Sequence, residues 1–181
     1  MGARTAFVAL APVVLAAGCT SGVAGQAVPR AVGAVPGASE SAPVDLSDLN
    51  PCDLLTGAAR SALNAAPGKR ARDLPSSTGC QWKINPGAPI AESYTLGIAI
   101  YPELGTGRIN STGAKTPTSV NSRPAVQYLG AANSVCVISL EVTAASRVDV
   151  TANRAGSGGS EVCPQAKAAA ELVEPELPPE G

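Results

Sequence analysis

Alternating hydrophobic and polar residues indicate several β-strands in the second half of the chain. Apolar side chains occupy every second position of residues 94–101 and 135–142, and a shorter alternation covers residues 80–84. A period of two places one side of a strand against a core and the other side toward solvent. Residues 148–152 fit a partner strand after a turn at residues 144–146. The pattern therefore predicts an antiparallel sheet with one wet face.

Two helices are expected at the two ends of this strand-rich region. Thr56 can cap a short helix that runs to about residue 64, and Ser160 can cap a final helix over residues 161–174. Pro164 is compatible with the second helix because first-turn amide groups have no partner inside a helix. The predicted fold is α+β: a single domain with an antiparallel β-sheet, N-terminal and C-terminal helices packed on one face, and two disulfides.

The stretches between these elements contain the candidate binding residues. Residues 104–118 are polar and glycine-rich, and a loop of that length is usually functional or mobile. Tyr101 directly precedes it, and Arg108 lies in a Gly-Thr-Gly-Arg segment that could hold an anion in a backbone nest. Tyr101 and Arg108 are therefore the candidate ligand-binding residues. The basic cluster at residues 69–72 is expected to be a solvated loop, with a polyanion site as the alternative.

The N-terminal stretch has the parts of a bacterial lipoprotein signal. Arg4 is its only charge, and residues 6–17 form an apolar run too short to span a bilayer. Small residues then precede Cys19, which would become the first residue of the mature chain and carry acyl chains such as palmitate. Ala16 stands where the commonest lipobox has Leu. An ordinary cleaved signal with a chance cysteine is the alternative.

The predicted lipoprotein signal determines the domain organisation and the cellular location that we expect. Residues 1–18 are predicted to be the signal peptide, and residues 19–50, rich in Gly, Ala, Pro and Ser, a flexible spacer. The α+β domain is predicted at residues 51–174 and a disordered tail at residues 175–181. The expected location is the extracytoplasmic face of the cell membrane, through the lipid anchor.

The charge balance, the absence of histidine and the cysteine content exclude several classes of function. The chain has 13 basic and 14 acidic residues, so nothing in its charge favours a nucleic-acid partner. It has no histidine, which excludes Ser/His/Asp and Cys/His catalytic sets. Besides Cys19, an even set of cysteines remains. In an exported chain they indicate disulfides; zinc is the rival interpretation, but no pair has CxxC spacing. The set is Cys52, Cys80, Cys136 and Cys163.

A combination of short motifs resembles a known family. They occur in this order: Cys52-Asp53-Leu54-Leu55, Cys80-Gln81-Trp82, Arg123-Pro124-Ala125, Cys136-Val137-Ile138, and Cys163 opening a terminal helix. The chain is similar in this respect to the actinobacterial cell-envelope lipoproteins grouped as domain-of-unknown-function family 3558. It departs from them at Ala59, often acidic in the family, and at Ser122, often Gly. The resemblance implies a lipobox, a Pro/Ser-rich spacer and one α+β domain, and it implies no activity.

The predicted disulfides are Cys52–Cys80 and Cys136–Cys163. Each would join the start of a helix to a strand close in sequence, so that both helices pack on one face of the sheet. A Cys52–Cys163 pair is the alternative connectivity.

The function expected from the sequence is a non-catalytic binding module of the cell envelope. Its ligand could be a partner protein, a wall polymer or a lipid, and lipid carriage would need a large apolar cavity. No metal and no cofactor are expected, and the protein should be a monomer. An envelope enzyme of the hydrolase type with an unrecognised site is the alternative.

Overall fold

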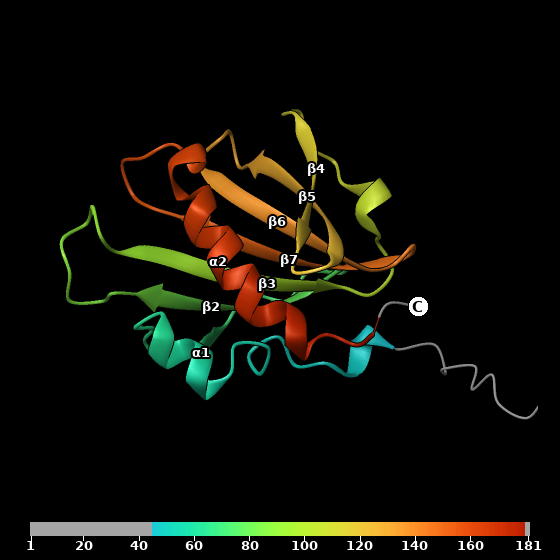
Figure 1. Cartoon of the computed structure of the whole chain (residues 1–181), viewed down its shortest axis with the longest axis horizontal. Helices are drawn as coiled ribbons and strands as arrows, with labels where there is room; N and C mark the ends of the chain where they lie inside the picture. The colour runs from blue at the N-terminus through green and yellow to red at the C-terminus, as the bar shows by residue number, and fades with distance from the viewer. Residues whose placement is uncertain (1–44, 180–181) are drawn as a thin grey trace, which may run out of the picture. The chain divides into compact units, whose positions relative to one another are not determined.

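A purely antiparallel sheet of seven strands forms the centre of the domain (Figure 1). The computed structural model describes residues 45–179. Strand order across the sheet is β1-β2-β3-β7-β6-β5-β4, so β1 and β4 are the edge strands. The strands are β1 Lys69–Arg70, β2 Thr78–Ile84, β3 Tyr94–Tyr101, β4 Lys115–Val120, β5 Arg123–Gly130, β6 Val135–Thr143 and β7 Ser146–Asn153.

Within residues 45–179, two α-helices and four short 3-10 helical turns accompany the sheet. The turns are η1 Leu46–Asp48, η2 Thr106–Arg108, η3 Gly159–Val162 and η4 Glu174–Glu176. Helix α2, Cys163–Val173, lies across β6 and β7. Helix α1, Gly57–Ala62, begins at Thr56, whose Oγ1 accepts a hydrogen bond from the Ala59 amide at 3.2 Å.

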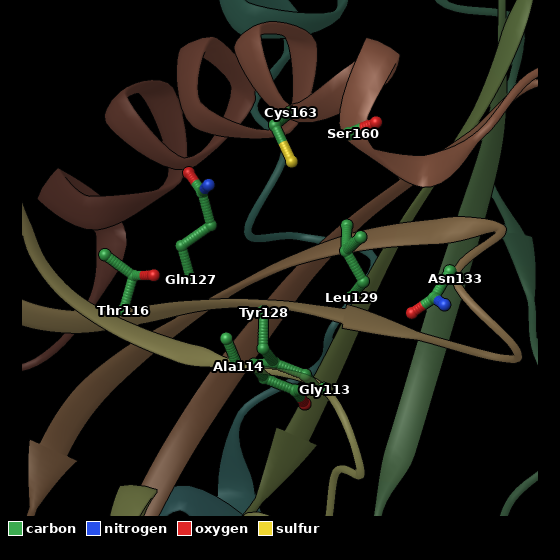
Figure 2. Close-up of a pocket in the computed structure, with 9 residues that line it drawn as sticks. All are labelled: Gly113, Ala114, Thr116, Gln127, Tyr128, Leu129, Asn133, Ser160 and Cys163. Carbon is green, nitrogen blue, oxygen red and sulfur yellow. The ribbon is translucent and has the colours of Figure 1, made fainter.

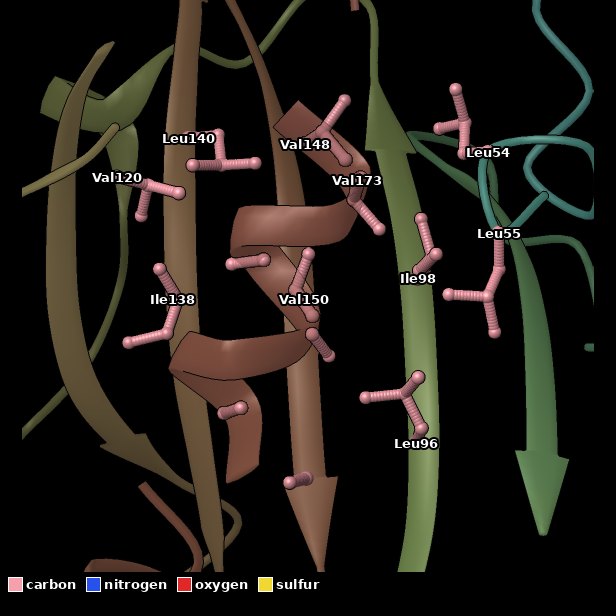
Figure 3. Close-up of a cluster of buried hydrophobic side chains, with 14 of the residues drawn as sticks. Leu54, Leu55, Leu96, Ile98, Val120, Ile138, Leu140, Val148, Val150 and Val173 are labelled. Atoms are coloured by element: carbon pink, nitrogen blue, oxygen red, sulfur yellow. The ribbon is translucent and has the colours of Figure 1, made fainter. Parts of the chain in front are cut away.

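The core lies between α2 and the sheet and consists almost entirely of aliphatic side chains (Figure 3). The alternating residues of β3, β6 and β7 point into it, as their sequence pattern predicts. Alanines on the facing side of α2 let the helix approach the strands closely, and Val173 packs at its C-terminal end. Each fully buried aliphatic side chain contributes about 1.5–3 kcal/mol of transfer free energy. The buried face of α2 comprises Cys163, Ala166, Ala169, Ala170 and Val173.

Both predicted disulfides are confirmed. Cys52–Cys80 joins the segment before α1 to β2, and Cys136–Cys163 joins β6 to the first residue of α2. The Cα atoms are 5.1 Å apart in the first pair and 5.2 Å apart in the second. Each bond therefore fixes the start of a helical segment to a strand of the sheet.

The long predicted loop ends earlier than expected. Strand β4 starts at Lys115 and pairs along its whole length with β5, so residues 115–118 are not loop. Most of its side chains are polar and exposed, and only Val120 is buried, which is why hydrophobic alternation does not reveal it. Pro117 lies on this edge strand. Pro124 lies at the start of β5, before the pairing with β6 begins at Ala125.

The final helix also begins differently. Ser160 does not cap it, because the chain first makes the turn η3 and α2 starts at Cys163. The carboxylate of Glu161 instead accepts a hydrogen bond from the Gly158 amide at 3.3 Å. Gly159 fits against the backbone of β6: a Cβ there would lie 2.7 Å from the carbonyl carbon of Val135. This close contact fixes η3 against β6, so that α2 begins only at Cys163.

The ordered domain extends past both predicted boundaries. Leu46, expected in the spacer, and Leu177, expected in the disordered tail, are both buried in the core. Arg123 also donates a hydrogen bond to the carbonyl of Pro178 at 2.7 Å, and this bond attaches the C-terminal segment to the domain. The predicted signal peptide, Cys19 and most of the spacer lie outside the described residues. Among residues 45–179, no helix is long and apolar enough to cross a membrane.

Candidate ligand-binding site

The face of the sheet opposite α2 is not fully exposed to solvent. Ser139 on β6 lies opposite Asp149 on β7, and Asp149 lies opposite Ala99 on β3. Ser139, Asp149 and the neighbouring Arg147 are all buried. The sequence pattern assigns these polar positions to solvent, and that prediction is wrong for the middle of the sheet because a loop covers them.

Asp149 is the centre of a buried hydrogen-bond network. Its Oδ1 accepts bonds from Ser139 Oγ at 2.5 Å and from Arg147 Nε at 3.0 Å, and its Oδ2 accepts one from the Tyr128 hydroxyl at 3.2 Å. Burial raises the pKa of Asp149, and the charge of Arg147 opposes that rise. The guanidinium of Arg147 also lies over the ring of Tyr101, 3.9 Å from its centroid. The Asp149 carboxylate, the Arg147 guanidinium and the hydroxyls of Ser139 and Tyr128 therefore each have a partner inside the domain.

The loop of residues 102–114 covers this hydrogen-bond network. Arg147 Nη1 donates to the carbonyls of Leu104 at 2.6 Å and Gly105 at 3.2 Å. Thr106 donates to the carboxylate of Glu141 at 2.6 Å. Gly105 lies so close to the β6–β7 turn that a Cβ would be 2.1 Å from the carbonyl oxygen of Ala144. The loop is therefore attached to the sheet.

Burial also changes the acid–base behaviour of Tyr128. Burial, and then the charge of Asp149, raise the pKa of its hydroxyl above the ordinary value. A raised folded-state pKa contributes stability that is complete below the unfolded-state pKa and is lost as the pH rises toward the folded-state value. We expect the free energy of unfolding to fall above about pH 10, and to fall less in Tyr128→Phe. Urea unfolding at several alkaline pH values checks this; equal slopes for both proteins would contradict it.

The structure does not bring the two predicted ligand-binding residues into one site. Tyr101 is half-buried against Arg147 and borders a groove of about 240 Å³ that also includes Gly97 and Thr151. Arg108 is exposed on η2 and does not line that groove. The amide of Arg108 donates to the carbonyl of Gly105, so this amide is already engaged in the turn. An anion nest around Arg108 is therefore not supported.

A larger pocket lies between β5 and the start of α2 (Figure 2). Its volume is about 280 Å³, close to the lower end of the roughly 300–1,000 Å³ of small-molecule sites. Gln127 and Leu129 point from β5 toward the helix, and Cys163 points back toward them. The sheet register explains this, because odd-numbered residues of β5 share the core face with Ala125. The end of the covering loop, Gly113 and Ala114, completes the wall.

A second pocket of about 210 Å³ adjoins the first and shares Tyr128, Leu129 and Asn133 with it. It lies between loop residues 110–112 and the β5–β6 turn. We call the two pockets together the β5 groove. Three consecutive turn residues, Ala131, Ala132 and Asn133, have positive φ angles of 44°, 55° and 65°. The carbonyl of Asn133 accepts a hydrogen bond of 2.7 Å from the amide of Gly159, which holds this turn against η3.

The chemistry of the β5 groove is polar but neutral. In the described part of the chain, no Lys, Arg, Asp or Glu lines either pocket. The side chains of Thr116, Gln127, Asn133 and Ser160 make no hydrogen bond with other groups of residues 45–179, and Leu129 and the Cys136–Cys163 disulfide supply an apolar floor. Sequence reasoning missed these residues, since neutral side chains spread over two strands and two turns form no motif.

The molecule is thus a small disulfide-linked α+β domain with an uncharged surface groove. The chain belongs to the family described as protein of unknown function (DUF3558), whose model matches residues 14–176. This confirms the family indicated by the cysteine-centred motifs. Searches of curated proteins and of solved structures found no match. The family description names no activity, so inferences about function rest on the groove and the N-terminal sequence.

Proposed function

We propose that the protein is a lipid-anchored module on the outer face of the cell membrane that binds an envelope component without catalysis. The N-terminal apolar run ending at Cys19 supports the anchor. The two disulfides support an extracytoplasmic location, since such bonds persist in oxidising compartments. The spacer would extend the domain away from the bilayer and toward the wall.

The β5 groove is the observation that carries the binding function. Ligand sites combine a mostly apolar surface with a few polar groups that fix orientation. The groove has both, with Leu129 at its floor and the polar groups of Gln127, Asn133 and Thr116 around it. Those groups have no partner among the described residues, so a ligand could use them without displacing an internal bond. A surface with unused polar groups and no acid–base pair suits binding rather than turnover.

One feature favours the enzyme alternative, and its surroundings weigh against it. The 2.5 Å contact between Ser139 and Asp149 resembles an activated hydroxyl. However, the Ser139 and Asp149 side chains are buried beneath the loop. The Asp149 carboxylate also already accepts hydrogen bonds from Arg147 and Tyr128. A nucleophile must reach its substrate, and this one is enclosed. We therefore assign the network a structural role.

The anchor is tested by Cys19→Ala expressed in the native host. The variant should be released from the membrane fraction or stay unprocessed, because the thiol that would carry the lipid is gone. Membrane fractionation and the migration of the protein on a gel check this. A variant that fractionates and migrates like the parent would contradict the lipoprotein assignment.

The binding function is tested by filling the groove with Ala114→Trp. Ala114 is an exposed lining residue, so the indole should occupy the pocket and leave the core unchanged. Binding of the full chain to isolated wall material should weaken about tenfold or more, which is about 1.4 kcal/mol. Ile90→Trp is the matched control, since Ile90 is 67 % exposed and lies outside the groove.

Two outcomes would contradict the proposed function. One is equal binding by the parent, Ala114→Trp and Ile90→Trp, which would remove the groove from consideration. The other is release of soluble fragments from the wall material that stops in Asp149→Asn while circular dichroism shows that this variant is folded, which would establish an enzyme.

A further inference from the structure

We propose that the β5 groove binds an uncharged, hydroxyl-rich oligosaccharide, an inference that rests on the binding function proposed above. Among residues 45–179, no Lys, Arg, Asp or Glu lines either pocket of the groove. A charged ligand leaving water would need a counter-charge or strong hydrogen bonds to offset its lost hydration. The groove offers no counter-charge, so its composition suits a neutral ligand.

The hydrogen-bonding groups of the groove match sugar hydroxyls. The amides of Gln127 and Asn133 each have an acceptor oxygen and a donor nitrogen, and the hydroxyls of Thr116 and Ser160 can do both. A sugar hydroxyl is likewise donor and acceptor, so each can pair in either direction. Leu129 and Ala114 provide an apolar surface for the C–H face of a pyranose ring.

The two pockets of the groove suit a chain of rings, because they share lining residues. Its two pockets hold about 280 Å³ and 210 Å³ and share Tyr128, Leu129 and Asn133. Consecutive rings could therefore occupy adjoining pockets, with Asn133 between them. Asn tolerates the left-handed backbone found at this position, φ 65°, better than most residues do, and this conformation places its amide at the junction.

A peptide is the competing ligand, and the edge strand beside the groove disfavours it. Extended peptides commonly bind by adding a strand to a sheet edge through main-chain hydrogen bonds. The edge here is β4, and Pro117 in its middle lacks the N–H that such pairing uses. The described residues that line the groove also include no charged side chain to hold a peptide terminus.

The test is calorimetric titration of the full chain, purified in detergent, with defined ligands. The neutral set is N,N′,N″-triacetylchitotriose, maltotriose and xylotriose. The comparison ligands are chitotriose, the cationic deacetylated form of the first, and an end-blocked Ala-Gly tetrapeptide. At least one neutral trisaccharide should bind saturably, and the comparison ligands should bind at least about tenfold more weakly.

Near-isosteric variants locate the binding. Gln127→Glu and Asn133→Asp keep size but place a charge and remove amide donors, so each should weaken trisaccharide binding about tenfold. Gln81→Glu makes the same change at an exposed position of β2 outside the groove and should alter affinity by less than about twofold. Circular dichroism of each variant verifies folding.

Three results would overturn the oligosaccharide inference: no binding by any neutral trisaccharide, tighter binding by chitotriose or the peptide, or unchanged affinity in both Gln127→Glu and Asn133→Asp. If wall binding is still lost in Ala114→Trp, the groove binds another ligand class and the proposed function stands. If wall binding does not depend on Ala114, the proposed function has failed as well.

Discussion

Replacing Asp149 by alanine is expected to lower the free energy of unfolding by about 3–5 kcal/mol, because the substitution leaves a buried guanidinium without its carboxylate. The Arg147 and Asp149 side chains are only 7 % and 5 % exposed, and their ion pair is 3.0 Å long. Urea unfolding followed by the fluorescence of Trp82, the single tryptophan of the chain, measures the change.

Asp73→Ala is the control for this prediction. Asp73 forms an ion pair with Arg70 at the surface, where the two side chains are 59 % and 51 % exposed. Removing this carboxylate should lower the free energy of unfolding by less than about 1 kcal/mol. The double variant Arg147→Met/Asp149→Leu should recover part of the loss, since no charge is then buried unpaired. The recovery is incomplete because the Ser139 hydroxyl and the carbonyls of Leu104 and Gly105 lose their partners. Equal effects of Asp149→Ala and Asp73→Ala would show that the buried network does not stabilise the fold as described.

Removing the Cys136–Cys163 disulfide with a pair of alanine substitutions is expected to destabilise the domain by about 3.6 kcal/mol on the chain-entropy model. The bond spans 27 residues and fixes the start of α2 to β6. Cys163 also lines the β5 groove, so ligand binding should weaken in the same variant. Urea unfolding and binding to wall material, measured on one preparation, separate the two effects.

The Cys52–Cys80 bond provides a matched control. It spans 28 residues, so its removal should lower stability by a similar amount, about 3.6 kcal/mol. It does not line the groove, and binding below the unfolding transition should be unchanged. Equal loss of binding in both double variants would mean that the groove depends on global stability rather than on the start of α2.

The central part of the fold was predictable because its residues alternate strongly. Strands β3 and β6 match the expected residues 94–101 and 135–142 closely, since each has every second side chain in the core. The cysteine pairs were predictable too, because each joins two elements that are neighbours in both sequence and space. These features depend on local pattern and short connections.

Other features depend on contacts that no local pattern encodes. Strand β4 is an exposed edge with almost no apolar residues, so alternation of hydrophobicity could not reveal it. Alternation assigns Arg147 and Asp149 to the solvent face of β7, but the attached loop and the side chains of Tyr101 and Tyr128 bury them. The groove residues come together through the register of β5 and the approach of η3.

The most direct measurement of the binding claim is amide chemical-shift mapping of the full chain titrated with soluble fragments of the host's wall material. Binding in the β5 groove predicts perturbed amides clustered around Gly113, Gln127 and Asn133, with the groove beside Tyr101 and Gly97 unchanged. Perturbations clustered around Tyr101 and Gly97, or no perturbation at saturating fragment concentration, would contradict it.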